Sequence, residues 1–206
     1  MITHPLREIS HIKEMMERSS RFKGISGVGG IASGMIAILT LSVYLTFSRK
    51  AFYAQLVSFD QIEFANQIER IIFLSVSCFA AAFSISFYFI WKRSNRMGIS
   101  IFSSFSKRVF INIAVPMFIG GLLLIKVCLL HYYDLVMPVC LLFYGMGLLG
   151  AARSTFREVY YLAAAFLFLG CMSLSLPGYA FLYWAIGFGI LHIIFGFFLW
   201  NRYEKN

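Results

Sequence analysis

One polar residue, His192, is better suited to chemistry than any other residue inside the long apolar stretches of this sequence. It lies near the middle of an apolar run, at a depth where ionisable side chains are rare and face a bundle interior or a cavity. A neutral histidine there can bind a proton, a ligand or a metal ion. Alternatively, it donates one hydrogen bond between helices and holds them together. The sequence is compatible with both interpretations.

A second set of polar residues comes from different apolar runs and is expected at one level near the cytoplasmic face. Its members are Asn112, Arg153, Glu158 and Tyr161. Together they would form a polar cluster at the mouth of a path that leads to His192. Alternatively, Glu158 occupies its position only because a carboxylate is favourable at a helix N-terminus.

Three further residues lie near the opposite ends of their runs. Lys126 can extend its long side chain to the headgroups, or it can act as the counter-charge for an anion in an outer cavity. Cys128 and Cys140 would reach matching depth in a hairpin, either as a thiol pair or as small apolar side chains. The sequence contains no Ser–His–Asp order, HExxH, P-loop or dinucleotide-binding glycine pattern, so we expect neither enzymatic activity nor a cofactor or metal site.

Small residues at four-residue steps predict a close helix contact in the first apolar run. Ser26, Gly30 and Gly34 lie on one helix face of the GxxxG type, which lets two helices approach closely. The partner helix belongs either to the same chain or to a second copy of it. The sequence therefore leaves a homo-oligomer open.

The elements that position these residues follow from composition. The chain has 206 residues, of which 60% are hydrophobic and 13% charged. A soluble domain has about 45–50% apolar and about 25% charged residues. Six apolar runs are each long enough to cross a bilayer as a helix. These predicted transmembrane spans cover residues 25–47, 71–91, 109–130, 135–152, 159–176 and 179–200.

The basic residues predict the orientation of the spans. Fourteen of the 18 lysines and arginines fall in the flanks on one side, three fall on the other side, and Lys126 lies within a span. Because short cytoplasmic loops are enriched in Lys and Arg, we expect both termini in the cytoplasm of a bacterial cell and the spans in its inner membrane. The net charge of +9 then reflects topology, and the expected partner is the lipid bilayer rather than a nucleic acid.

The two ends of the chain complete the expected organisation. Residues 1–24 are rich in charge and carry apolar side chains at helical spacing. This pattern predicts an amphipathic helix, which lies either in the cytoplasmic headgroup region or under the bundle as a cap. No cleavable signal peptide is expected, so the first span would act as its own insertion signal. Residues 25–200 form the transmembrane domain, and residues 201–206 form a cytoplasmic tail.

Short turns between spans three and four, and between spans five and six, predict an all-α fold of three helical hairpins. The last hairpin resembles the repeating unit of the HdeD-like family of bacterial inner-membrane proteins, which are linked to acid resistance. The residues that carry this resemblance are Leu169, Gly170, Pro177, Trp184, Gly187 and Gly196. Nearly the whole chain also resembles an uncharacterised bacterial six-helix membrane family, through the segments 15–22 (MMERSSRF), 112–116 and 187–196 (GFGILHIIFG).

These resemblances imply a fold and a location. We therefore expect a non-enzymatic inner-membrane protein that serves stress tolerance or membrane homeostasis. The alternative is a small channel or transporter with a polar path through His192. A lipid-modifying membrane enzyme is disfavoured, because no acidic or nucleophilic pair lies at one interface.

Reporter fusions test the predicted topology. Fusions after residues 50, 133 and 178 should report a periplasmic position, and fusions after residues 100, 155 and 206 a cytoplasmic one, because the basic flanks stay inside. Alkaline phosphatase and fluorescent-protein activities measure the two positions. A cytoplasmic signal after residue 133 would contradict the assignment of spans three and four.

Overall fold

The computed structural model describes residues 24–47, 61–98, 100–101 and 103–205. The amphipathic helix predicted for residues 1–24 lies almost wholly outside the described residues. The described part of the chain is helical and contains no strand, which confirms the expected all-α class. Its main helices are α2 (Gly27–Phe47), α4 (Gln61–Asn66), α5 (Ile68–Arg96), α6 (Ser104–Leu129), α7 (Val136–Ala152), α8 (Glu158–Ser175), α9 (Ala180–Trp184) and α10 (His192–Tyr203).

Within the described residues, six helical segments are long and apolar enough to cross a membrane, as the sequence predicted. Four of them are formed by α2, α5, α6 and α8, and another consists of α7 with the short 3-10 helix η1 (Tyr133–Leu135) before it. The sixth is composite: α9 continues through a π-helical stretch, η3 (Ala185–Leu191), into α10. We call this composite helix span six.

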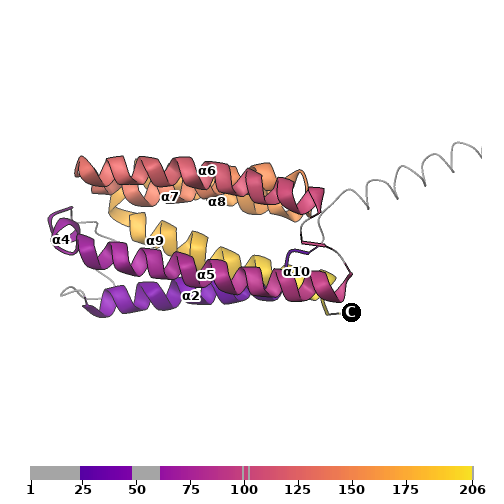
Figure 1. Cartoon of the computed structure of the whole chain (residues 1–206). Coiled ribbons are helices and arrows are strands. Elements are labelled where there is room, and N and C mark those ends of the chain that lie inside the picture. The colour runs from indigo at the N-terminus through magenta and orange to yellow at the C-terminus, as the bar shows by residue number, and fades with distance from the viewer. Residues whose placement is uncertain (1–23, 48–60, 99, 102, 206) are drawn as a thin grey trace, which may run out of the picture.

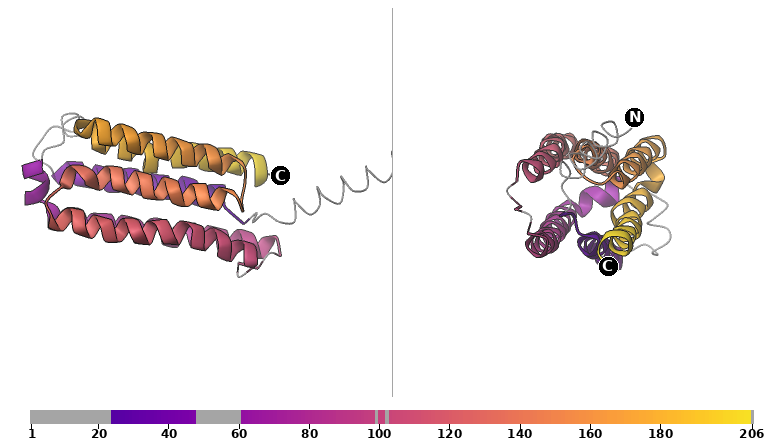
Figure 2. Two further views of the ribbon diagram at one scale, coloured as in Figure 1. Left: turned by 90° about the horizontal axis from the view of Figure 1, so that it is seen from above. Right: turned by 90° about the vertical axis from the view of Figure 1, so that its right-hand side faces the viewer.

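The spans form an incomplete ring (Figures 1 and 2). Contacts run from α5 to α2, from α2 to span six, and from span six through α8 and α7 to α6. Helices α5 and α6 follow one another in the chain, yet they form no comparable interface with each other. The end-on view in Figure 2 shows them at the two ends of the ring. The ring is therefore open on one side.

The closest helix contact joins the first span to the last. A Cβ atom at Gly34 would lie 2.6 Å from the carbonyl oxygen of Gly189, and one at Gly196 would lie 2.5 Å from the carbonyl oxygen of Gly27. Only glycine allows the two backbones to approach this closely. Gly30 also faces Gly196, so small residues are required along the whole contact.

Apolar clusters close the ring near both ends. At the end that holds α4, Tyr44, Ile71 and Phe181 pack with Tyr133 and Met137. At the other end, Ile90 of α5 packs against Val109 of α6 and Ala151 of α7. This second end also holds the start of α2 and the end of α10 (Figure 1). Most of the described basic residues belong to the helix ends and turns on this side. We call it the basic end.

Two helices extend beyond the apolar runs that predicted them. Helix α5 covers Ile68–Arg96, where the apolar run covers residues 71–91, and α6 begins at Ser104 instead of residue 109. Hydropathy marks the part of a helix that lies in hydrocarbon, whereas capping decides where the helix ends. The Ser103 side chain accepts a hydrogen bond from the Ser106 amide and so starts α6 before its apolar part.

Replacing Gly34 with alanine should lower the free energy of unfolding by about 1–3 kcal/mol, because the new methyl group meets a backbone oxygen that cannot move aside. Gly121→Ala is the matched control, since a Cβ there meets no atom within 4 Å. Thermal unfolding in detergent measures both variants. Equal stability of the two would contradict the close contact between α2 and span six.

Candidate functional site

His192 is buried in the bundle and both of its ring nitrogens have partners. Its Nδ1 atom lies 3.1 Å from the carbonyl oxygen of Gly187, and its Nε2 atom lies 2.8 Å from the hydroxyl of Tyr144 on α7. A carbonyl oxygen only accepts, so Nδ1 carries the proton and donates. The neutral ring then accepts the Tyr144 hydrogen at Nε2. Every polar atom of the side chain is thus satisfied within the protein.

Aromatic side chains surround the same imidazole ring. Phe188 stacks on it with a ring-centroid distance of 6.0 Å, and the rings of Phe166 and Tyr144 each lie 5.4 Å away. These three rings also contact one another. His192 is therefore enclosed by aromatic groups from α7, α8 and span six, an arrangement that favours the hydrogen-bonding interpretation over a solvated one.

The π-helical stretch η3 positions this group. A π-helix shifts the hydrogen-bond register of a helix, and such stretches often occur at functional sites. Gly187 lies within η3, and a Cβ there would lie 2.8 Å from the Leu141 side chain and 3.1 Å from that of Phe166. Glycine at this position lets span six approach α7 and α8, which brings the Gly187 carbonyl and His192 beside Tyr144.

Asn112 joins α6 to α7. Its side-chain amide donates to the carbonyl oxygen of Gly150 at 3.0 Å, and a Cβ on Gly150 would lie 3.2 Å from the Asn112 Cβ. Pro116, four residues later, has no N–H to donate to the Asn112 carbonyl, so the helix has one hydrogen bond fewer at this point. Asn112 supplies a bond between helices where α6 lacks one of its own.

The structure does not bring the four predicted cluster residues together. Glu158 binds the last turn of α10, as described below. Arg153 and Tyr161 are exposed, and Asn112 bonds to Gly150. Among the described residues, no hydrogen bond or ion pair joins these four side chains to one another.

The remaining predicted residues lie at the opposite end or along α2. Lys126 is exposed in the last turn of α6, which suits both interpretations given above. Cys128 and Cys140 are free thiols. Gly30 and Gly34 contact span six of the same chain, so this face of α2 is occupied within the protein and is not free for a second copy.

A largely buried ion pair at the basic end was not predicted. Arg93 of α5 pairs with Glu204, which follows α10, and their side chains are only 11% and 14% exposed. The Glu204 carboxylate also accepts from the Gly27 amide at the start of α2 and from the Ser26 hydroxyl at 3.4 Å. A carboxylate is favourable at a helix N-terminus, where amides lack helical partners. Glu204 therefore caps the first span.

Arg93 makes further hydrogen bonds at the same place. We call the group of Ser26, Gly27, Arg93 and Glu204 the basic-end clamp. The Nη1 atom of Arg93 donates to the Ile25 carbonyl at 2.8 Å, and its Nη2 atom donates to the Tyr203 carbonyl at 3.2 Å. A fork of donors suits several acceptors at once, which lysine would not match. The clamp links the start of α2, the last turns of α5 and the end of α10.

Tyr203 extends these contacts to α8. Its hydroxyl donates to Glu158 at 2.9 Å, and its ring stacks on Phe156 at 4.4 Å. Arg202 pairs with the same carboxylate at 3.2 Å but is 59% exposed. Glu158 therefore binds α10, and this explains its place at the start of α8 better than a path into the bundle does.

Sequence patterns contained little signal for the partners of these residues. Tyr144 lies 48 residues before His192, and Glu204 lies 111 residues after Arg93, so each pairing depends on how the helices pack. One weak signal was present: Glu204 is a carboxylate directly after the last span, in a flank that is otherwise basic. Among the described residues, no three His, Cys, Asp or Glu side chains gather as metal ligands would.

The fold defines a class of protein: this chain is a multi-pass integral membrane protein with a polar group at the centre of an aromatic cluster. In comparisons with family models, curated proteins and solved structures, nothing matches the chain.

Removing the carboxylate of the clamp should destabilise the protein. Glu204→Gln should lower the free energy of unfolding by about 1.5–3 kcal/mol, since it leaves the largely buried Arg93 charge without its counter-charge. Arg202→Gln at the exposed pair is the control and should cost less than about 1 kcal/mol. Chemical or thermal unfolding in detergent measures both. If the two variants lost similar free energies of unfolding, the Arg93–Glu204 pair would contribute no more to stability than a surface pair.

Proposed function

We propose that this chain is a non-enzymatic protein of the bacterial inner membrane, with both termini in the cytoplasm, which serves stress tolerance or membrane homeostasis through its packed helical fold. The observation that carries the proposal is the environment of His192. Both ring nitrogens are bonded within the protein, and aromatic rings enclose the side chain. A proton or ion carrier needs its central polar group accessible from at least one side, and this histidine is better suited to holding helices together.

Other polar residues of the spans support the same proposal. Asn112 bonds α6 to α7, and Ser33 bonds to Ser86 between α2 and α5 at 2.6 Å. In both cases the polar side chain joins neighbouring helices. Interhelical hydrogen bonds of this kind contribute about 0.6–2 kcal/mol each in a membrane. The resemblance of the last hairpin to acid-resistance membrane proteins is the ground for naming stress tolerance.

Reconstitution separates this function from that of a channel or transporter. Purified protein in liposomes should carry no proton or ion flux above that of empty liposomes. Tyr144→Phe and His192→Leu should each lower stability by about 0.6–2 kcal/mol, and the double variant should lose less than the sum, because both changes remove one shared bond. Flux in the parent protein that His192→Gln abolishes would establish the transport alternative instead.

A genetic experiment tests the physiological part of the proposal. Cells that lack the protein should lose viability at low pH or under membrane stress, and the parent gene should restore it. His192→Gln should restore viability as well as the parent does when the two proteins are present at equal levels. Restoration by the parent alone would mean that the imidazole itself takes part in the function.

A further inference from the structure

The open side of the ring exposes an aromatic face of α5. Phe79 and Phe83 are 58% and 50% exposed, and their rings stack at 6.1 Å. They precede Ile90 by eleven and seven residues, which places all three on one helix face. Because Ile90 packs against Val109 and Ala151, this face of α5 is directed toward α6 and α7. Phe79 and Phe83 therefore line the space between α5 and α6.

The facing side of α6 is also apolar and incompletely filled. Ile113 packs against Gly147 of α7 and in the same cluster as Ile90, so it lies at the boundary between the α7 side and the α5 side of α6. Met117 and Gly121 follow it at four-residue steps and are only partly buried. A Cβ on Gly121 would meet no atom within 4 Å. The facing sides of α5 and α6 are thus apolar and incompletely packed against each other. We call the space between them the crevice.

Hydrocarbon is the material available to occupy such a crevice. Empty space beside apolar walls forfeits dispersion contacts, and water is not stable without polar partners. The clusters described above close the ring toward its two ends. The crevice is therefore accessible sideways, from the surrounding lipid.

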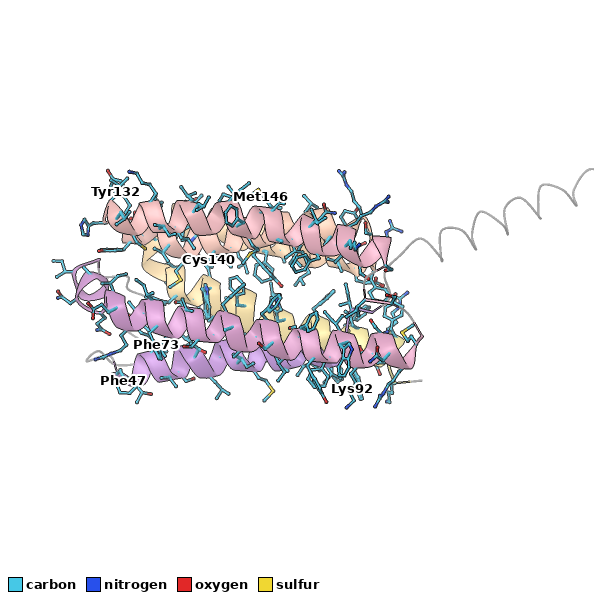
Figure 3. All side chains as sticks on the ribbon, viewed as in Figure 1. Phe47, Phe73, Lys92, Tyr132, Cys140 and Met146 are labelled. Atoms are coloured by element: carbon cyan, nitrogen blue, oxygen red, sulfur yellow. The ribbon has the colours of Figure 1, made fainter. Side chains whose placement is uncertain are left out.

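The basic side chains near the crevice indicate which lipid headgroup would lie at its basic end. Lys107, Ala114 and Gly121 follow one another at steps of seven residues, so they lie along one stripe of α6 with an exposed lysine at its basic end. The two carboxylates described at that end, Glu158 and Glu204, are paired with Arg202 and Arg93. Further exposed basic side chains surround the position: Lys92 (labelled in Figure 3), Arg96 and Arg108.

The distance along α6 from Lys107 to Gly121 also matches the length of a phospholipid in one leaflet. From Lys107 to Gly121 the helix rises about 21 Å. One leaflet measures about 15 Å of hydrocarbon and about 5–7 Å of headgroup region. A phosphate beside Lys107 would therefore place the end of its acyl chain near Gly121.

We propose that the crevice between α5 and α6 binds one anionic phospholipid from the leaflet at the basic end, with its phosphate at Lys107 and one acyl chain that passes Phe83 and ends between Phe79 and Gly121. This acyl chain completes the ring of helices on the side where α5 and α6 do not meet. The positive charge of Lys107 and its neighbours selects an anionic headgroup over a zwitterionic one.

Native mass spectrometry of the detergent-solubilised full chain tests the site. Titration with phosphatidylglycerol should show one tightly retained copy, and phosphatidylcholine should bind at least tenfold more weakly. Gly121→Leu should fill the crevice and weaken phosphatidylglycerol binding at least tenfold, and Lys107→Gln should weaken it about fivefold. Leu122→Phe, on the exposed outer face of α6, and Lys126→Gln, at the opposite end, are the matched controls and should leave binding unchanged. Soluble glycerophosphoglycerol and inorganic phosphate should not compete.

A photoreactive lipid provides a second measurement that needs no variant. Phosphatidylglycerol with a diazirine at the end of one acyl chain should label the residues around Phe79 and Gly121, and excess unlabelled phosphatidylglycerol should remove this labelling. Labelling of Leu122 on the outer face should resist competition. Equal competition at both faces, binding of both lipids with equal affinity, or a change from monomer to dimer in Gly121→Leu without lipid loss would overturn the proposal.

Discussion

The backbone contact between α2 and span six is the constraint on which the rest of the fold depends. Gly27, Gly30 and Gly34 lie against Gly189 and Gly196 so closely that a single methyl group does not fit at several of these positions. In a bilayer, lipid is as apolar as the helix surfaces, so helices associate through such close packing and through hydrogen bonds between them. Because this contact joins the first span to the last, it closes the arrangement on one side and leaves α5 and α6 as the two ends of the ring.

The polar contacts reinforce this arrangement where glycine contacts are absent. His192 joins span six to α7, and Asn112 joins α7 to α6. Burying these groups is favourable only when all of their hydrogen-bonding atoms find partners. The π-helical stretch helps here, because it places the Gly187 carbonyl beside the imidazole while the aromatic rings keep out other ligands. The aromatic cluster around His192 thus has the features of a structural centre.

The sequence predicted the helices well and their partners poorly. Six apolar runs sufficed for the spans, because crossing hydrocarbon requires a long apolar helix whatever the tertiary structure. Three residues of the GxxxG type predicted a close contact along α2, but not that Gly196 lies opposite. The expected cluster of Asn112, Arg153, Glu158 and Tyr161 relied on depth alone. Depth fixes the position of a residue along the membrane normal and leaves its direction around the helix undetermined, so Tyr161 is exposed while Asn112 contacts α7.

The basic-end clamp also constrains how the protein is made. Glu204 caps an amide that lies 177 residues earlier in the chain, so α2 enters the membrane long before its own capping group has been synthesised. During translation the Gly27 amide must rely on water or headgroups, and Arg93 must wait for its counter-charge. The early spans are therefore held by the contact of α2 with α5 until span six arrives and docks. Span six therefore supplies both the cap of the first span and the surface that covers its glycine face, so neither is in place until the last part of the chain has been made.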